Sequence, residues 1–461
     1  MGRKEAYQLF HEGALALTTM EQQGLRIDVM HLRKEMRKIT GKIKKLETEF
    51  EESKFYEDWQ KSLKGKKVNT NSGKQLADYL YGVKGYTPPK ETKSGKGSTD
   101  EESLVLLNIP ELNKILKIKK LKVIRDRYLK GFDREQIDGQ IHPFFHLHLA
   151  RSFRGSADRP NVQNIPKRDE EAMQIVRSTI YPRKGHQLLE LDYKQLEVRI
   201  AACYHRDPTM CKYLEEGHDM HGEYAQKIFS FGGTDFPNYK WLRAATKNGF
   251  VFPQFYGDYY KNNANFICKN WIQLPTKRWK KRQGMELSEG KYISAHMIEQ
   301  GITSYVDFEK HLQEIERIFW EETFPVYARW KERWWKRYKR KGEFTSLTGF
   351  TYHGVFKRND VGNYPFQGSA FHVLLWSLIQ GVKAQKEERW RTKIVGQIHD
   401  ALVLDVYPDE LKHVIHVMKC IMCNDVRQKW PWIIVPLEID AELCPVDGSW
   451  AEKEDYEINK I

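Results

Sequence analysis

Two aspartates stand near the ends of strand-like segments that lie far apart in the sequence. Asp192 belongs to "HQLLELDY", and Asp400 follows His399 in "GQIHDALVLDV". If these strands are neighbours in one sheet, the two carboxylates meet at its rim and repel each other unless a cation lies between them. Mg²⁺ suits such a place because it accepts one or two carboxylates plus substrate phosphates. The alternative is that each aspartate is an ordinary turn residue.

A second candidate site is the segment "WLRAATKNGF". Arg243 and Lys247 stand four residues apart in it, and therefore on one face of a helix. Two like charges in that arrangement repel each other unless an anion joins them, and a triphosphate would do so. At the carboxylate pair, two Mg²⁺ ions about 3.5–4 Å apart could then activate a hydroxyl and stabilise the pyrophosphate that departs from this triphosphate. The alternative is an ordinary solvated basic face.

The charge balance of the chain favours a polyanionic partner. Its 76 Lys and Arg residues outnumber 62 Asp and Glu residues, which gives a formal net charge of +14 over 461 residues. Nucleic acid and an anionic membrane surface both fit this excess, as does a merely soluble basic surface. No stretch approaches the twenty or so apolar residues of a spanning helix, so we expect no membrane partner.

The six cysteines and the first residues bear on location. Six cysteines in a chain of this length indicate a reducing compartment. The start, "MGRKEAYQLFHEGALAL", lacks the apolar core and cleavage site of a secretion signal, so we expect a cytoplasmic location. Cys420 and Cys423 form one C-x-x-C. Their segment has helical apolar spacing and no second pair follows, so we predict a packed helix face rather than a zinc site.

The elements that would position these residues are mostly helical. Residues 28–63 predict one long exposed helix, and "LNKILKIKKLKVIRDRYLK" predicts a second basic helix. Between them lies a lysine-rich loop, after which Ser98 or Thr99 is expected to cap a helix. Residues 211–345 are expected to be mostly helical and 346–353 to form a short hairpin. A buried helix in "YPFQGSAFHVLLWSLIQGVKAQ" and a strand in "WIIVPLEIDAEL" follow.

Taken together, the motifs resemble those of family A DNA polymerases, and they occur in the order typical of that family. "LDYKQLEVRIAA", "RAATKNGFVFPQFYG" and "QIHDALV" resemble the family's motifs A, B and C. Further matches are "NTNSGKQLADYL", "SFRGSADRPNVQNIPKR", "HDMHGEYA" and "NYPFQGSAFHVL". Each motif alone is of moderate specificity, whereas the ordered set is very specific.

The resemblance implies an α+β fold shaped like a right hand, with an antiparallel sheet in the palm, helical fingers and a helical thumb. It also implies domain boundaries along the chain. We expect an N-terminal helix packed on the palm (1–25), a thumb (26–138), a first part of the palm (139–222), fingers (223–345) and a second part of the palm (346–461).

The resemblance assigns roles at the reaction centre. Asp192 and Asp400, with the main-chain carbonyl of Tyr193, would hold two Mg²⁺ ions, for which Mn²⁺ could substitute. Lys247 would be catalytic by protonating the leaving pyrophosphate. Glu197 would be a steric gate that excludes a 2′-hydroxyl. Its alternative role is that of a surface acid on a helix.

Further residues would bind the nucleotide and the DNA. Those expected to bind the incoming dNTP are Glu197, His221, Arg243, Lys247, Phe252 and Tyr256. Those expected to contact primer–template DNA are Arg154, Gln163, Asn164, Asn363, Gln367 and His399. Alternatively, Tyr256 is a core residue and Asn363 a helix cap. Arg168 belongs to its motif without a separate role.

Three departures from the family pattern stand out. Tyr256 lies nine residues after Lys247 instead of the usual eight, with Pro253 in the interval. Proline removes a helical hydrogen bond, so we predict a kinked or bulged helix, which leaves open whether Phe250, Val251 or Phe252 faces the incoming base. Ala401 stands where the family often has Glu, and "SFR" replaces "TGR" before the expected DNA contacts.

These expectations add up to a template-directed DNA polymerase that extends a primer with dNTPs, in a bacterium or a phage-infected host cell. Only about 25 residues precede the expected thumb, so we predict no 3′–5′ proofreading. We expect a monomer that can act together with a separate exonuclease or processivity subunit. Two alternatives stay open: a single-subunit RNA polymerase, and a non-catalytic DNA-binding accessory protein that retains the fold.

Overall fold

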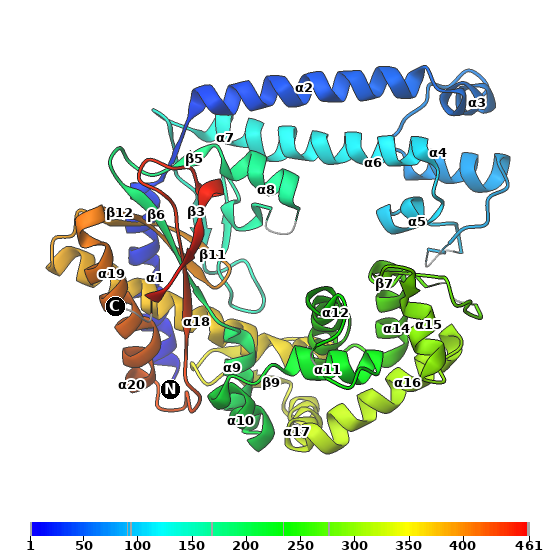
Figure 1. Ribbon diagram of the computed structural model, residues 1–461. Helices are drawn as coiled ribbons and strands as arrows, with labels where there is room; N and C mark the ends of the chain where they lie inside the picture. The colour runs from blue at the N-terminus through cyan, green and yellow to red at the C-terminus, as the bar shows by residue number, and fades with distance from the viewer. Residues whose placement is uncertain are drawn as a thin grey trace.

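A five-stranded antiparallel sheet forms the centre of the fold (Figure 1). The structure, a computed structural model, describes residues 2–89, 91–92, 95–166, 169–233, 235–274 and 277–458. The strand order is β11–β12–β6–β13–β14, with bounds Lys393–Ile398, Ala401–Val406, Gln187–Tyr193, Ile439–Leu443 and Glu454–Tyr456. Successive residues of β12 and most of those of β6 are buried, so both faces of the central strands are covered.

Two long helices pack beside this sheet. Helix α1 (Arg3–Gln23) and helix α18 (Arg358–Glu387) contact each other, and both contact β11. They approach closely at Gly13, where an added Cβ would lie 2.7 Å from the side chain of Leu375. Helix α9 (Leu196–His205), which follows β6, also packs on α18. The sheet edge and the middle of α18 are thereby held in a fixed relation.

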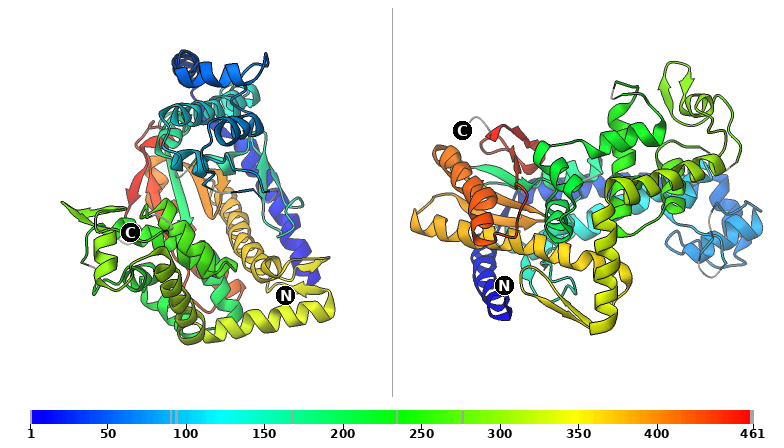
Figure 2. Two further views of the ribbon diagram at one scale, coloured as in Figure 1. Left: turned by 90° about the vertical axis from the view of Figure 1, so that its right-hand side faces the viewer. Right: turned by 90° about the horizontal axis from the view of Figure 1, so that it is seen from below.

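The region predicted as the thumb projects from the sheet as two long helices, α2 and α6, that lie side by side (Figures 1 and 2). The prediction of one helix over 28–63 is wrong. Helix α2 ends at Glu51, and α3 begins at Lys54 because the hydroxyl of Ser53 accepts a hydrogen bond from the Tyr56 amide at 3.2 Å. The helices of this region are α2 (Val29–Glu51), α3 (Lys54–Ser62), α4 (Gly73–Ala77), α5 (Glu101–Leu106), α6 (Pro110–Val123) and α7 (Lys130–Glu135).

The expected cap of α5 also needs correction. The capping residue is Asp100, whose carboxylate accepts a hydrogen bond from the Ser103 amide at 2.8 Å. Ser98 and Thr99 precede the cap. The tip of this region has its own hydrophobic core, which is separate from the main one and centres on Phe50, Trp59, Leu76, Tyr79, Leu80, Leu104, Leu112 and Ile115.

The region predicted as the fingers is mostly helical, as expected, with one small hairpin of β7 (Glu286–Ser288) and β8 (Lys291–Tyr292). A π-helical turn over Lys247–Val251 joins α12 to α13. The helices of this region are α11 (Met220–Phe229), α12 (Tyr239–Thr246), α13 (Phe252–Tyr256), α14 (Tyr260–Asn270), α15 (Ile293–Glu299), α16 (Tyr305–Arg317) and α17 (Pro325–Lys341).

The hairpin expected at 346–353 starts earlier than predicted. Strand β9 (Glu343–Thr345) pairs with β10 (Thr351–His353), so residues 346–350 form the loop. Cys420 and Cys423 lie in a π-helical turn that continues α19, which agrees with the predicted helix. The remaining elements are β1 (Leu25–Ile27), β2 (Gln140–Ile141), β3 (Phe144–His146), β4 (Ser156–Asp158), α8 (Glu170–Arg177), β5 (Ile180–Tyr181), α10 (Pro208–Glu216), α19 (Leu411–Lys419) and α20 (Val426–Lys429).

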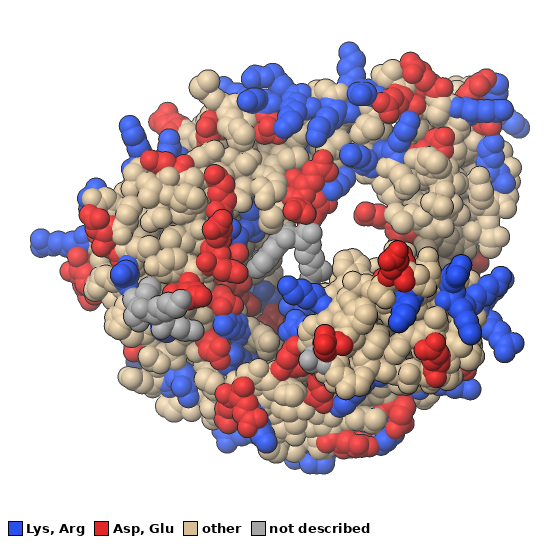
Figure 3. Space-filling model, in the orientation of Figure 1, with Lys and Arg blue, Asp and Glu red and all other residues tan. Residues whose placement is uncertain are grey.

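The two projecting regions and the sheet surround an opening (Figure 3). Above it lie α2 to α6, below it α11 to α16, and beside it the sheet. Within the described residues, no helix combines the length and apolarity needed to cross a bilayer.

Candidate active site

The two strand-end aspartates come together at one edge of the central sheet. Strands β6 and β12 are antiparallel, and Asp192 pairs directly with Ala401, the residue after Asp400. The amide of Tyr193 donates a hydrogen bond to the carbonyl of Asp400 at 3.2 Å. Directly paired residues have Cα atoms about 4.5–5.5 Å apart, so Asp192 and Asp400 can reach the same point in space. The expectation that the strands of Asp192 and Asp400 are neighbours in one sheet is confirmed.

Asp400 lies in a tight turn. His399 and Asp400 are the two residues between β11 and β12, whose last and first residues, Ile398 and Ala401, pair directly. His399 has a φ of 54°, in the left-handed region, and is exposed. The turn presents both polar side chains beyond the end of the sheet, which explains how an otherwise buried hairpin carries them.

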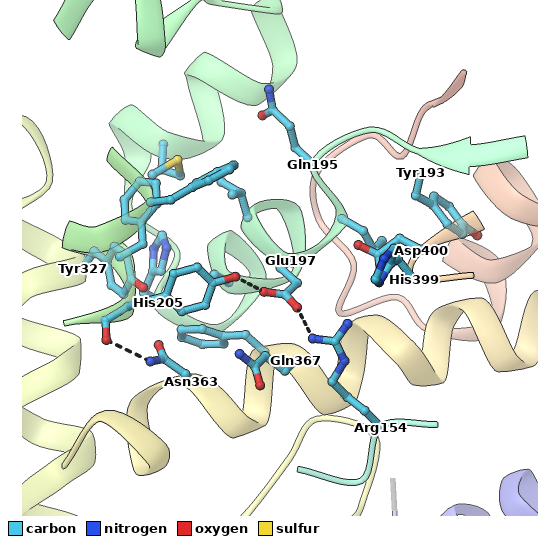
Figure 4. A pocket seen from close by; sticks show the side chains of 18 of the residues that line it. Arg154, Tyr193, Gln195, Glu197, His205, Tyr327, Asn363, Gln367, His399 and Asp400 are labelled. Atoms are coloured by element: carbon cyan, nitrogen blue, oxygen red, sulfur yellow. Dashed lines mark hydrogen bonds and ion pairs between the residues drawn. The ribbon is translucent and has the colours of Figure 1, made fainter. Parts of the chain in front are cut away.

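Both carboxylates line one cavity of about 490 Å³ (Figure 4). It is bounded by the sheet edge, α9, α13 and α18. Tyr193, the third predicted metal ligand, lines it too, as do most of the residues predicted to bind nucleotide or DNA: Arg154, Glu197, Phe252, Tyr256, Asn363, Gln367 and His399. Residues that were not predicted also line it, among them Gln195, His205, Phe255, Tyr327 and Phe366.

Glu197 is held from two sides inside this cavity. Its Oε1 accepts a hydrogen bond from Arg154 Nη1 at 2.9 Å, and its Oε2 accepts one from the hydroxyl of Tyr256. The side chain of Glu197 is only 19 % exposed, so it is not a surface acid. Burial and the charge of Glu197 raise the pKa of Tyr256 well above its usual value, and Asp400 adds to the shift.

Tyr256 and Asn363 meet at the far end of the cavity. Tyr256 is 43 % exposed, so it is not a core residue. Its carbonyl accepts a hydrogen bond from Asn363 Nδ2 at 3.1 Å. Asn363 lies inside α18 rather than at its cap, and Gln367 follows one turn later on the same face. Figure 4 shows Gln367 beneath Glu197, and Asn363 turned toward the main-chain carbonyl that accepts its hydrogen bond.

Two of the predicted DNA contacts do not line this cavity. Gln163 donates a hydrogen bond to Gln397 at 2.7 Å, and Gln397 donates one to the carbonyl of His399 at 2.5 Å. Gln163 therefore supports the turn that carries Asp400. Asn164 accepts a hydrogen bond from the Tyr128 hydroxyl through its carbonyl, at 2.8 Å. Arg168 lies outside the described residues.

Two of the three predicted triphosphate ligands line a second cavity, which also borders α9. They are Arg243 and His221, and the cavity has a volume of about 240 Å³. Nε of Arg243 lies 2.8 and 3.0 Å from the two oxygens of Asp219, which also accepts hydrogen bonds from the Tyr239 hydroxyl and the Gly222 amide. Although burial opposes it, hydrogen bonding from Arg243 lowers the pKa of Asp219 to about 2.

His221, which lines the second cavity, and Lys247 both lie against Phe252, which lines the first. The ring of His221 meets that of Phe252 edge-on at 5.5 Å, and the Lys247 ammonium lies 5.3 Å from the same ring. Burial lowers the pKa of His221 to about 4, and the charges of Arg243 and Lys247 add to the effect. Its Nδ1 is buried and has no hydrogen-bond partner among the described residues, so a bound ligand would satisfy it, as acceptor or donor according to the tautomer.

The extra residue before Tyr256 is absorbed by the π-helical turn over Lys247–Val251. A π turn accommodates one residue more than an α turn, so the predicted bulge is present. Phe250 and Val251 are fully buried, whereas Phe252 lines the cavity. The structure thus places Phe252 beside Lys247 and Tyr256.

Sequence reasoning missed Asp219, Gln397 and His205. Asp219 stands inside the matched segment "HDMHGEYA", which was the available signal. Gln397 is a buried polar residue in a strand, and such residues need a partner. His205 stacks on Tyr327 at 3.9 Å, and no local pattern distinguishes it from a core residue.

The donor set at the sheet edge fits a hard cation. Two carboxylates, Asp192 and Asp400, stand next to the main chain of Tyr193. Across the described ranges, no group of three or more His, Cys, Asp or Glu side chains is arranged to hold a metal ion. A cation here would therefore take further ligands from substrate or water, which is typical of Mg²⁺ and not of structural zinc.

Comparisons with known proteins give a consistent result. DNA polymerase I of Lactococcus lactis subsp. cremoris is 26 % identical over 381 residues, 82 % of this chain and 39 % of the relative. DNA polymerase I of Chloroflexus aurantiacus is 25 % identical over 450 residues, 95 % of this chain and 42 % of the relative. The chain thus spans about two fifths of the length of these curated relatives.

A solved structure shows the same fold. It is the polymerase domain of Pol1 from M. smegmatis in complex with DNA primer-template and dNTP, with 22 % sequence identity and a TM-score of 0.74. The match covers 96 % of this chain and 70 % of the other, which confirms the α+β right-hand fold. The model of DNA polymerase family A matches residues 33–262 and 298–452. Because this match covers well over half of its residues, the chain belongs to DNA polymerase family A.

Proposed function

We propose that this chain is a template-directed DNA polymerase that extends a DNA primer with dNTPs by two-metal nucleotidyl transfer and releases pyrophosphate. The observation that carries the proposal is the pair Asp192 and Asp400, which neighbouring strands bring to one cavity. Family membership and the net charge of +14 support it.

The carboxylates of Asp192 and Asp400 and the carbonyl of Tyr193 would hold two Mg²⁺ ions, with Mn²⁺ as a substitute. Ions bound there would activate the primer 3′-hydroxyl and stabilise the charge on the departing pyrophosphate. The rest of the rate enhancement would come from positioning and charge stabilisation by the protein.

The triphosphate would be bound by Arg243, Lys247 and His221. Lys247 would give a proton to the leaving pyrophosphate through its ammonium group. His221, kept neutral by its surroundings, would donate from one ring nitrogen to a phosphate oxygen. Phe252 would pack against the incoming base, because of the three candidates Phe250, Val251 and Phe252 it is the one that lines the cavity, and it lies beside Lys247.

The protein would check base pairing near the N-terminal end of α18. Arg154, Asn363, Gln367 and His399 line the cavity and would contact the minor groove of the primer end, where all correct pairs share acceptors. Tyr256 would lie near the templating position. Gln163 would act mainly by holding the His399 turn, and Asn164 would contact the duplex beside it.

A primer-extension assay tests the proposal, run with dNTPs and with rNTPs. Asp400→Ala is expected to abolish extension while primer–template binding is largely retained. The matched control is Asp440→Ala. Asp440 pairs with Asp192 from the opposite strand, and its side chain is 65 % exposed and bound to Lys194. The control should extend normally. Extension by Asp400→Ala would refute the metal assignment.

The same assay separates the alternatives. Synthesis with rNTPs and without a primer would indicate a single-subunit RNA polymerase, and DNA binding without extension would indicate an accessory protein. A mismatched primer end tests the predicted lack of proofreading, because shortening of that primer contradicts it. The monomeric state and a separate exonuclease or processivity subunit remain predictions.

A further inference from the structure

Helix α17 carries a dense row of cations. Its sequence, "PVYARWKERWWKRYKRK", contains a single acidic residue, Glu332. The spacing i, i+4, i+7, i+11 of Arg329, Arg333, Lys336 and Arg340 places these four on one face. The left view of Figure 2 shows α17 along the lower edge of the molecule. The exposed cations of the helix are Arg329, Arg333, Lys336, Arg337, Lys339, Arg340 and Lys341.

None of these seven cations forms an ion pair with a carboxylate within the part of the chain that the structure describes. Glu332 pairs with Arg358 of α18 instead. By contrast, the α6 lysines Lys120 and Lys122 each lie 2.7 Å from a carboxylate. Like charges one turn apart destabilise a helix, so an uncompensated row of this length favours an anionic partner.

The flank of α17 continues into the candidate active site. Trp334 and Trp335 line a cavity of about 250 Å³ together with Tyr256 and Asn363, which also line the cavity of the paired aspartates. The ring of Trp335 stacks on Tyr338 at 5.5 Å. The tryptophan flank of α17 therefore borders the site beside Tyr256, and the row of cations runs along the neighbouring face of the same helix.

An aromatic ring beside the cations favours a single-stranded ligand over a duplex. The Lys339 ammonium lies 5.8 Å from the half-buried ring of Trp335. Proteins that bind single strands combine cations along the backbone with aromatic rings that stack on bases. A duplex keeps its bases stacked on each other and would use only the cations.

We propose that the exposed face of α17 binds the single-stranded template ahead of the templating base, with phosphates on its cations and a base against Trp335. This inference rests on the proposed function, since it assigns the path of that enzyme's template. The strand would leave the site past Tyr256, cross the flank of α17 at Trp335 and continue along the row of cations.

The chain offers a matched control for the test. Residues 277–282 carry five exposed cations around Trp279, which is 5 % exposed and packs on Phe308. These cations also lack ion pairs among the described residues, but their aromatic residue is buried. The test variant is Arg333→Ser with Lys336→Ser and Arg340→Ser. The control variant is Lys277→Ser with Lys280→Ser and Lys281→Ser.

Fluorescence anisotropy would measure binding of one primer–template duplex with a template overhang of about two or about twelve nucleotides, the latter typical of single-strand site sizes. With the long overhang, the α17 variant should bind about tenfold or more weakly, and its salt slope should fall by about 2, at about 0.7 per phosphate contact. The short overhang and the control variant should bind as the parent does. Trp335→Leu should weaken binding of the long overhang without changing the salt slope.

An equal loss on both overhangs, an equal loss in the control, or no loss would overturn the inference. A loss that grows with duplex length would assign the face to the duplex and overturn it as well. The binding assay needs no catalysis, so its result can contradict this inference without contradicting the proposed function. If the parent chain extends no primer, the proposed function fails, whatever the overhang dependence.

Discussion

The hydroxyl of Tyr256 donates a hydrogen bond to the carboxylate of Glu197, and so joins α13 to α9 across the cavity. The second oxygen of Glu197 accepts from Arg154 at 2.9 Å. With both oxygens engaged, these two hydrogen bonds hold the carboxylate in the cavity. Because the pKa of Tyr256 is raised, its hydroxyl stays protonated and remains a donor. Glu197 is therefore held in a fixed place in the cavity, as its proposed role of steric gate requires.

Replacing Glu197 by Ala should relax sugar selectivity. The missing side chain leaves room for a 2′-hydroxyl, and a difference of that size in a pocket is worth on the order of 1–3 kcal/mol. The ratio of dNTP to rNTP kcat/KM should fall about tenfold or more. Single-nucleotide incorporation kinetics with dATP and ATP measure it.

The control for this prediction is Glu197→Gln. It keeps the bulk of the side chain and loses the charge, so sugar selectivity should stay close to that of the parent. If Gln relaxes selectivity as much as Ala, then charge rather than bulk excludes the ribose. If neither variant changes selectivity, Glu197 is not the gate.

Removing Arg243 should weaken nucleotide binding selectively. Hydrogen bonds to charged groups contribute about 1.5–3 kcal/mol, so Arg243→Ala should raise the KM for dNTP about 10- to 100-fold. The Kd for primer–template DNA should stay within a factor of about two, since other residues line the predicted DNA site. Nucleotide titrations at saturating primer–template give the KM, and an anisotropy titration gives the Kd.

Asp219→Asn should separate the positioning of Arg243 from the contact that Arg243 makes with the nucleotide. Asp219 keeps Arg243 in place through contacts of 2.8 and 3.0 Å, and Asn cannot supply the same charge. The KM for dNTP should rise by less than in Arg243→Ala. A rise as large as that of Arg243→Ala would mean that Arg243 acts only in its Asp219-bound position.

The parts of the site that could be predicted are those with a local signature. The segment "HQLLELDY" gave β6 to within a residue, because apolar residues bounded by polar ones define a strand. The bulge before Tyr256 followed from one extra residue and Pro253, which a regular helix cannot accommodate. The meeting of Asp192 and Asp400 was expected only if their strands were neighbours. It occurs because β6 ends next to Asp192 and the antiparallel strand β12 begins directly after Asp400.

The parts that could not be predicted depend on distant partners. Gln163 bonds to Gln397, 234 residues away, and no periodicity in either segment encodes that pairing. The break after Glu51 was missed because Lys and Glu spacing continues across it, while one hydroxyl, that of Ser53, starts a new helix. Local capping there outweighs a pattern summed over many residues.

Gly249 tests the packing of the π-helical turn. An added Cβ would lie 2.5 Å from the side chain of Ile267, which is fully buried and cannot move aside. Gly249→Ala should therefore lower the free energy of unfolding by about 1–3 kcal/mol. Urea denaturation measures it. As a control, Gly41→Ala on the exposed side of α2, where nothing lies within 4 Å, should stabilise by about 0.5–1 kcal/mol. Equal effects at both positions would contradict the close packing at Gly249.

The buried His372 should make the protein sensitive to mild acid. Its ring donates from Nε2 to the Phe153 carbonyl at 3.1 Å and accepts at Nδ1 from Thr348 at 2.7 Å, and burial lowers its pKa to about 3. The unfolded chain takes up this proton near pH 6.5 and the folded chain does not. Stability is therefore lost as the pH falls from about 6.5 toward 3, by about 2 kcal/mol at pH 5.

His372→Gln removes this contribution. The loss in the free energy of unfolding that the substitution causes, measured by urea denaturation, should therefore be about 2 kcal/mol smaller at pH 5 than at pH 7. His205 and His221 also have lowered pKa values but are present in both proteins, so their contributions cancel in the comparison. An equal cost at both pH values would show that His372 does not titrate between the folded and unfolded states.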